Sequence, residues 1–251
     1  IFEMQNILPP IIKYGMTFLF VQNEFGLCCP VSMTDSLTRT LKKFGDEKLI
    51  NKFFEQLTSQ DIDELFQGAM FMTEQHAGSD VGSIDTIAEN IEGQWYLSGD
   101  KWFCSNPDAD LAMVLARYDK KTKGTRGLSL FLLPKKLENG QPNNYEIIRL
   151  KDKLGGRSFA SGEIRLNKAF AYIVGEKTEG FKQMTDMINM SRLSNGVRAS
   201  GMMQRCFQES LFIAKTRSAF NEKLINLPLI RKQLLKILII TEASRTMVFK
   251  A

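Results

Sequence analysis

Histidine is almost absent from the sequence, and cysteine is scarce. The 251 residues include one histidine, His76, and four cysteines. His76 has no Cys or His companion at the spacing of metal ligands, so the sequence predicts no zinc site and no other metal centre. Cys28 and Cys29 are adjacent, and with Cys104 and Cys206 they form no paired framework. This pattern favours a reduced intracellular protein, and we expect a cytoplasmic location.

Long apolar runs and common nucleotide-binding loops are also missing. No uninterrupted apolar stretch approaches the roughly 18 residues that a membrane span needs; the candidate at 234–240 is short and contains Lys236. No basic segment precedes an apolar one at the beginning of the sequence, so no signal peptide is predicted. Neither Gly-x-Gly-x-x-Gly after a strand nor Gly-x-x-x-x-Gly-Lys-Ser/Thr occurs, which argues against dinucleotide-binding Rossmann folds and P-loops.

Charge is unevenly distributed along a chain whose composition is that of an ordinary globular protein. With 43% apolar and 24% charged residues, the chain can bury a sizeable core in one large domain or two smaller ones. Residues 181–251 contain 12 Lys and Arg against 4 Asp and Glu, a net charge of +8, which leaves −3 for residues 1–180. A basic segment can face nucleic acid, the phosphates of a nucleotide, or solvent alone, and charge does not choose among these.

The first quarter of the sequence predicts helices. Apolar residues in 31–66 recur at spacings of three and four, as at Met33, Leu37, Leu41 and Phe44. Gly45 supplies a stop, and Asp46 can cap a second helix whose apolar face packs into the same core. Residues 1–30 have no simple period, because Pro9, Pro10 and Gly15 interrupt it.

From about Gly68 the pattern changes to short β-rich runs separated by turn signals. The predicted strands are 69–74, 85–91, 94–98, 101–105, 111–118, 127–133 and 161–166. Glu92-Gly93 and Ser98-Gly99-Asp100 predict tight turns. These runs indicate a barrel or a small sandwich.

The pattern reverts to helix after Gly180. A single apolar stripe runs for roughly 35 residues without proline, which is typical of a bundle helix, and Pro228 opens another helix. The fold class is therefore α+β and multidomain: a helical part (1–67), a central antiparallel β-barrel or sandwich (68–172) and a C-terminal helical bundle (173–251). Because the chain starts without Met and stops inside a helical pattern, we expect a fragment with incomplete helical parts.

Two segments of the β-region carry the first recognisable motifs. Met72-Thr73-Glu74-Gln75-His76-Ala77-Gly78-Ser79-Asp80 ends a strand and turns, and Lys101-Trp102-Phe103-Cys104-Ser105-Asn106 follows as a second strand. Together they resemble the flavin-binding segments of the acyl-CoA dehydrogenase family. Hydroxyls and strand-end amides suit the polar edge of a flavin, and a glycine lets the backbone approach a phosphate. Each segment alone also reads as an ordinary strand end, turn or core strand.

Two later segments extend the resemblance to nearly all of residues 20–250. Leu150-Lys151-Asp152-Lys153-Leu154-Gly155-Gly156-Arg157-Ser158 is similar to the last stretch of the family's β-domain, and Lys215-Thr216-Arg217-Ser218-Ala219-Phe220 is similar to a segment of its C-terminal domain. Within the family, the set looks closest to the AidB-like adaptive-response branch, which is associated with FAD, weak dehydrogenase activity and DNA binding.

The resemblance implies FAD as the cofactor and assigns it a set of residues. The implied cofactor-binding residues are Met72, Thr73, Gly78, Ser79, Phe103, Cys104, Ser105, Arg217 and Phe220. Phe103 would pack on the isoalloxazine, Ser105 would bond near its reactive nitrogen, and Arg217 would reach the pyrophosphate of an FAD held mainly by a neighbouring subunit. A dimer or tetramer is therefore expected. Arg192 matches a position that the family places near the substrate or the flavin, and we assign it to the substrate. Pro228 departs from the family, because many relatives have Gln there.

The function implied is FAD-dependent α,β-dehydrogenation of an acyl-CoA thioester in fatty acid metabolism, with AidB-like DNA binding as the alternative. The resemblance expects the catalytic Glu beyond Ala251, because Ser191 stands where a minority of relatives place it. Glu74 belongs to the flavin strand end and is not a candidate for the base. We therefore expect the chain by itself to lack a complete catalytic site. By strand alternation, one of Trp102 and Phe103 is expected to face the core.

Overall fold

The computed structural model describes residues 8–251, which form two compact units. The larger unit is Cys29–Ser191, and the smaller one combines the N-terminal residues through Cys28 with Arg192–Ala251. No helix among the described residues is long and apolar enough to cross a bilayer. The three domain ranges expected from sequence stay predictions.

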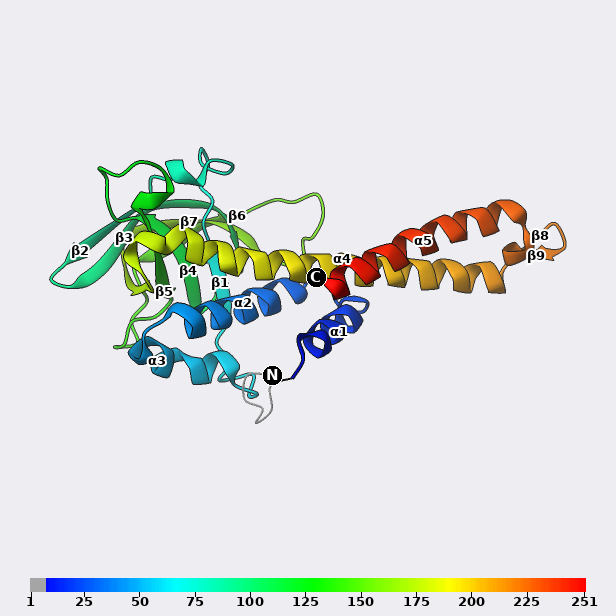
Figure 1. The fold of residues 1–251 in the computed structure, drawn as a ribbon, viewed down its shortest axis with the longest axis horizontal. Helices are drawn as coiled ribbons and strands as arrows, with labels where there is room; N and C mark the ends of the chain where they lie inside the picture. The colour runs from blue at the N-terminus through cyan, green and yellow to red at the C-terminus, as the bar shows by residue number, and fades with distance from the viewer. Residues whose placement is uncertain (1–7) are drawn as a thin grey trace. The chain divides into compact units, whose positions relative to one another are not determined.

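A seven-stranded sheet forms the centre of the larger unit (Figure 1). Its strands are β1 (Gly68–Phe71), β2 (Ile87–Ile91), β3 (Gln94–Ser105), β4 (Leu111–Arg117), β5 (Leu128–Pro134), β6 (Tyr145–Leu150) and β7 (Ser161–Val174). Strands β3, β7, β5, β4 and β1 pair in succession, and β1 pairs with β3 again, so the sheet closes on itself. The expected α+β fold with a central barrel is confirmed. Two pairings, β1 with β4 and β2 with β4, are parallel rather than antiparallel.

Strand alternation divides the core into two layers. In β4, Leu111, Met113 and Leu115 belong to the cluster that packs against the helices, whereas Ala112 and Val114 belong to the cluster inside the barrel. Because both faces of this strand are buried, its sequence is a continuous apolar run rather than an alternating one.

The prediction of a tight turn at Ser98-Gly99-Asp100 was wrong. These residues lie inside β3, where Gly99 pairs with Leu166 of β7. Gly99 has φ +143°, and a Cβ there would lie 2.8 Å from the Cα of Thr86. The glycine is therefore required by a close approach of two backbones and not by a reversal of the chain. The turn at Glu92 and Gly93 is confirmed, since both have positive φ between β2 and β3.

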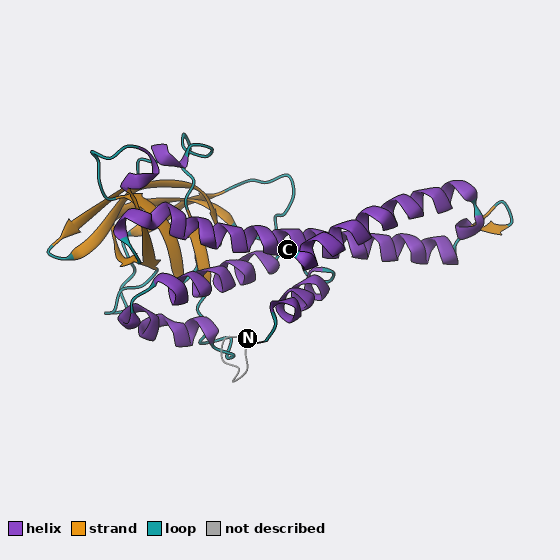
Figure 2. Ribbon diagram, in the orientation of Figure 1, coloured by secondary structure: helices purple, strands orange, loops and turns teal. Residues whose placement is uncertain are grey.

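The helices of the larger unit cover one face of the sheet (Figure 2). They are α2 (Cys28–Phe44), α3 (Glu47–Thr58) and the beginning of α4 (Gly180–Thr216). As predicted, α2 ends just before Gly45, and the Asp46 carboxylate accepts a hydrogen bond from the Leu49 amide at 2.7 Å to cap α3. The sequence missed β6 and more than half of β7, residues 167–174.

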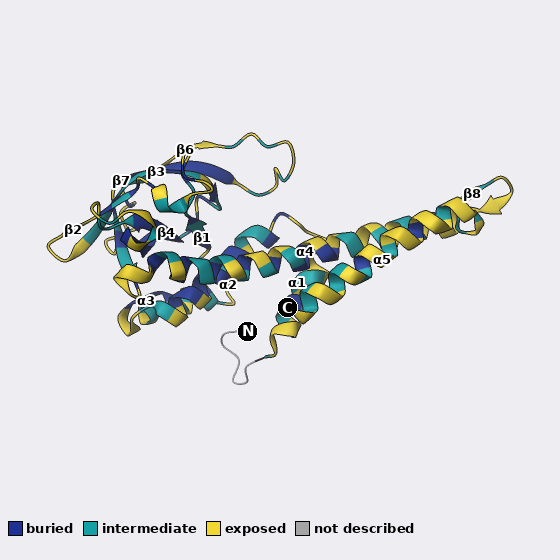
Figure 3. Cartoon of the chain, turned by 45° about the horizontal axis from the view of Figure 1, so that its top comes forward, coloured by how far each residue is buried: buried dark blue, intermediate teal, exposed yellow. Residues whose placement is uncertain are grey.

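The smaller unit contains α1 (Pro10–Val21), the rest of α4 and α5 (Pro228–Lys250), with the short strands β8 (Ser218–Ala219) and β9 (Glu222–Lys223) between the last two helices. Pro228 opens α5 as predicted. A Cβ on Gly201 would lie 2.5 Å from Val21, so this glycine lets α1 approach α4 closely. Many apolar side chains of α1 and α5 are exposed (Figure 3).

Candidate functional site

The two motif segments of the β-region lie side by side in the structure. Met70 of β1 pairs with Ser105 of β3, and the Trp102 amide donates to the Thr73 carbonyl at 2.8 Å. The end of β1 and the end of β3 therefore form one surface, which carries Met72 and Thr73 from the first motif and Phe103 from the second.

A β-bulge gives the second motif its shape. Lys101 pairs with Ile164 and Cys104 pairs with Gly162. Strand β3 therefore advances by three residues over a stretch in which β7 advances by two. The extra residue breaks the in-and-out alternation of the side chains. As a result Phe103 is 58% exposed and Trp102 is only partly buried, and their rings meet edge to face at 6.4 Å. The expectation that one of the two faces the core was wrong for this reason.

Cys104 follows the bulge, and its side chain points into the barrel, away from the surface that carries Phe103. Its side chain is fully buried in the cluster inside the barrel, and burial raises the pKa of its thiol to about 12. Of the implied cofactor residues, Cys104 can therefore contribute only its backbone at the surface.

The third motif supplies a cation to the aromatic pair. The Lys151 ammonium lies 3.3 Å from the centre of the Trp102 ring and 2.6 Å from a carboxylate oxygen of Glu163. Arg149 contacts the same oxygen at 2.9 Å. Burial raises the pKa of Glu163, but hydrogen bonds from Lys151 and Arg149 outweigh it and lower that pKa. Lys151 is thus held by a buried carboxylate beside the exposed Phe103.

The turn of the first motif offers free hydrogen-bonding groups. Among residues 8–251, the amides of Gly78 and Ser79 and the hydroxyls of Thr73, Ser79 and Ser105 have no hydrogen-bond partner. A Cβ on Gly78 would meet only the Thr73 methyl, at 3.7 Å. Nothing in the protein itself thus requires glycine at position 78, whereas a ligand that approached the backbone there would require it. These residues fit a cofactor with a planar ring and phosphates.

Glu74 and Lys101 form a buried ion pair that sequence reasoning missed as part of the site. The two side chains are 3% and 1% exposed, and their charged atoms lie 2.8 Å apart. Burial alone would raise the pKa of Glu74, but the Lys101 ammonium and the hydrogen bonds of Lys101, Thr86 and Asp85 lower it. A carboxylate with so many donors is a poor proton acceptor, which agrees with its exclusion as a base. The only signal for this pair in the sequence was that Lys101 belongs to the second motif segment.

The remaining predicted residues belong to the smaller unit. Arg192 is exposed on α4, and Arg217 is exposed directly after its end. Phe220 is 89% exposed at the tip of the β8 and β9 hairpin, where Phe220 and Asn221 both have positive φ, at 56° and 64°. Because Ala219 pairs with Glu222, these two residues form a two-residue hairpin turn, which requires positive φ at both positions, a conformation that a bulky aromatic residue rarely takes.

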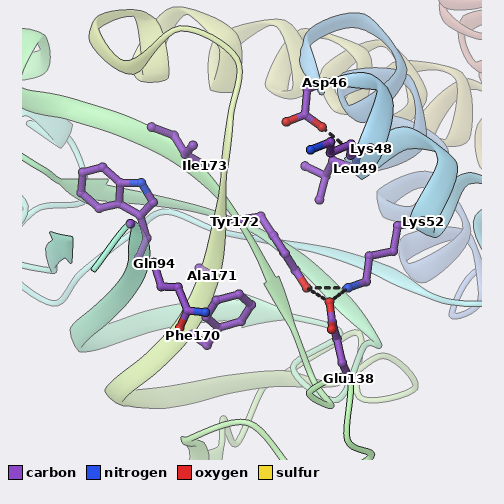
Figure 4. Close-up of a pocket in the computed structure, with 12 residues that line it drawn as sticks. Asp46, Lys48, Leu49, Lys52, Gln94, Glu138, Phe170, Ala171, Tyr172 and Ile173 are labelled. Carbon is purple, nitrogen blue, oxygen red and sulfur yellow. Dashed lines mark hydrogen bonds and ion pairs between the residues drawn. The ribbon is translucent and has the colours of Figure 1, made fainter. Parts of the chain in front are cut away.

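A cavity of about 450 Å³ lies elsewhere in the larger unit (Figure 4). Its wall includes Lys52, whose ammonium binds the Tyr172 hydroxyl at 2.7 Å and the Glu138 carboxylate. None of the implied cofactor residues lines it. In residues 8–251 no group of three or more His, Cys, Asp or Glu could hold a metal.

A helical segment, a closed barrel with an exposed aromatic ring and a turn with unpaired amides, and a long following helix are the architecture that the resemblance to a flavoprotein family led us to expect. Two family models match: the acyl-CoA dehydrogenase middle domain over residues 69–169 and the acyl-CoA dehydrogenase C-terminal domain over residues 178–251. The chain belongs to the acyl-CoA dehydrogenase family, whose members are FAD flavoproteins.

Individual relatives agree with the family models. Acyl-CoA dehydrogenase family member 11 of Caenorhabditis elegans is 35% identical over 96% of this chain and 40% of its own length. The putative acyl-CoA dehydrogenase AidB of Escherichia coli is 34% identical over 96% of this chain and 45% of its length. The chain thus spans less than half of these relatives.

Solved structures give the same result. The C. elegans ACDH-11 structure in complex with C11-CoA has a TM-score of 0.90 and 32% identity, covering 98% of this chain and 44% of that one. PigA with FAD and proline, at 22% identity and a TM-score of 0.84 over 94% of this chain and 61% of its own, shows the fold alone.

Proposed function

We propose that this chain is the flavin-binding part of an FAD-dependent acyl-CoA dehydrogenase that introduces an α,β double bond into an acyl-CoA thioester. Family membership and a relative solved with C11-CoA support this reaction class. The observation that carries the proposal is the surface at the ends of β1 and β3, where an exposed aromatic, unpaired hydroxyls and the unpaired amides of a turn lie together.

Each part of that surface has a proposed role. Phe103 packs on the isoalloxazine, the hydroxyls of Thr73 and Ser105 bond its polar edge, and Gly78 and Ser79 receive a phosphate. Met72 and Cys104 contribute through their backbones. When bound, FAD accepts the hydrogen that leaves the β-carbon as hydride.

Two proposed residues act toward a neighbouring subunit. Arg217 can meet phosphate oxygens in pairs with its guanidinium, and Phe220 packs beside it. This role requires a homo-oligomer, a dimer or tetramer. The exposed ring of Phe220 supports a contact that the chain does not make with itself. Arg192 is proposed to face the substrate.

The α-proton needs a carboxylate base, and no described residue is assigned to it. Glu74 is saturated with donors, and Ser191 precedes Arg192. The chain alone is therefore expected to bind FAD without reducing a dye in the presence of acyl-CoA.

Titration of FAD into the purified chain tests the proposal. We expect saturable binding and a yellow complex that survives gel filtration. A chain that stays colourless at high FAD would refute it. The reaction itself is tested in a longer protein that carries this chain, by loss of flavin absorbance when an acyl-CoA is added without oxygen.

DNA binding is a second candidate, favoured by the net charge of +8 in residues 181–251 and by the similarity to AidB. Binding to random duplex should weaken steeply with salt, because displaced counterions are released. Absence of binding at low salt would remove this candidate without affecting the flavin proposal.

A further inference from the structure

The turn that follows β1 is connected to the sheet by two buried charges. Glu74 and Lys101 are almost fully excluded from water. Burying an ion pair is seldom worthwhile for stability alone, because the desolvation penalty can exceed the attraction between the charges. The hydrogen bonds around this pair indicate what else it does.

Lys101 links the beginning of the turn to the sheet. From its place in β3, its ammonium donates to the carbonyl of Met72, at 3.2 Å, and to the carbonyl of Leu115 in β4, at 2.8 Å. The third donor bond goes to Glu74 at 2.8 Å. One cation therefore joins β3, β4 and the residues that enter the turn.

Glu74 closes the turn. Its carboxylate accepts hydrogen bonds from the amides of Asp85, at 2.6 Å, and Thr86, at 3.0 Å, and from the Thr86 hydroxyl at 2.5 Å. The residue that enters the turn is thus bound to the residues that leave it, and the segment between them cannot drift without breaking these bonds.

A second anchor holds the far side of the turn. The Arg117 guanidinium donates to the carbonyls of Gly82, at 2.6 Å, and Gly124, at 3.3 Å. Between the two anchors lie Gly78 and Ser79, whose amides have no partner among residues 8–251. The unpaired amides of Gly78 and Ser79 therefore lie in the part of the turn that is held from both sides.

We propose that Glu74 and Lys101 are positioning residues, which hold the amides of Gly78 and Ser79 in the arrangement that receives the phosphates of the cofactor. The inference rests on the flavin site proposed above. An apolar pair of the same volume could fill the space, but it would leave the amides of Asp85 and Thr86 without an acceptor.

The test compares Glu74→Gln with Asp100→Asn. Gln keeps the shape of the side chain but removes the charge and one acceptor, so the turn loosens. Asp100 is next to Lys101 on β3 and forms an exposed ion pair with Arg165, so its variant controls for the loss of any carboxylate on this strand. FAD affinity of the folded proteins is measured by quenching of flavin fluorescence, and amide hydrogen exchange of residues 77–84 is measured without FAD.

We expect Glu74→Gln to weaken FAD binding by about tenfold or more, because reordering even one residue of backbone costs roughly that factor. Exchange in 77–84 should be faster, and Asp100→Asn should match the wild type in both measurements. A purely structural pair would lower the melting temperature and leave the affinity of the folded variant unchanged, which would overturn the proposal.

Two further results keep the inference separate from the proposed function. If the wild type binds no FAD, the flavin proposal fails and this one fails with it; if the wild type binds and folded Glu74→Gln binds equally well, only the positioning role fails. If Glu74→Gln does not fold, Thr86→Val replaces it. That variant removes one donor to Glu74 and leaves the ion pair, and it should shift affinity and exchange in the same direction by a smaller factor.

Discussion

The Lys151 ammonium lies over the Trp102 ring, 3.3 Å from its centre, and 4.4 Å from the centre of the Phe103 ring. Lys151 comes from the segment after β6, and the two aromatic residues come from the bulge of β3. Glu163 of β7 holds the ammonium in this place. Two strands and the segment after β6 thus fix the aromatic pair that the proposed flavin site uses.

Replacing Lys151 with Met should release the aromatic pair. The loss of the cation over two rings is expected to cost about 1 kcal/mol of unfolding free energy and to change tryptophan fluorescence, since Trp102 is one of two tryptophans. Urea denaturation followed by fluorescence measures both. Lys177→Met is a matched control, because Lys177 lies over the other tryptophan, Trp95, at 5.2 Å. Identical spectral changes in the two variants would contradict the assignment to Trp102.

Two glycines of the site region should respond oppositely to alanine. Gly99→Ala places a Cβ 2.8 Å from the Thr86 Cα at φ +143° and should destabilise the fold by about 1–3 kcal/mol. Gly78→Ala meets only ordinary contact at 3.7 Å, so the fold should tolerate it while FAD binding weakens. Chemical denaturation and FAD titration of both variants check this. Unchanged FAD affinity in Gly78→Ala would argue against close approach of a phosphate there.

Phe103→Ala should separate binding from stability in the same way. Because the ring is 58% exposed, its loss is expected to change unfolding free energy by under about 1 kcal/mol, while FAD affinity falls. The comparison is Phe71→Ala, whose ring is 1% exposed and whose loss should cost about 3–5 kcal/mol. If Phe103→Ala proved as unstable as Phe71→Ala, the ring would be a core residue and not a ligand platform.

Stability should fall at alkaline pH through two buried groups. Burial raises the pKa of the Cys104 thiol from 9.0 to about 12 and the pKa of the Tyr145 hydroxyl from 10.0 to about 12. A group whose pKa is higher in the folded protein contributes stability below its unfolded pKa and loses it as pH rises toward the folded value. The free energy of unfolding should therefore decrease between pH 9.0 and about 12.

Cys104→Ala tests the source of that decrease. The variant should lose less stability than the wild type over the same pH range, as measured by urea midpoints. Cys206→Ala is the control, because Cys206 is exposed. Equal pH dependence in all three proteins would show that the Cys104 thiol is not responsible.

Local signals in the sequence were sufficient for α2, α3, α4 and α5 and for most strands, but not for α1, whose period Gly15 interrupts. Gly45 and Asp46 mark helix ends through hydrogen bonds made within a few residues, and Pro228 opens α5 through its fixed φ, so these roles are visible without a tertiary structure. The strand β6 was missed because five of its six residues are exposed and its pattern does not alternate.

The sequence by itself determined the family, because its motifs can be recognised from residue types and their order alone, without a structure. It also indicated the candidate cofactor-binding residues, such as Thr73 and Phe220. Only the tertiary structure decided how they act. The bulge that turns Phe103 outward depends on pairing with β7, and the reason for Gly99 is the backbone of Thr86 across the sheet. The partnership of Glu74 with Lys101 joins residues 27 apart through burial. Contacts of this kind depend on which strands become neighbours, and residue type alone does not encode that.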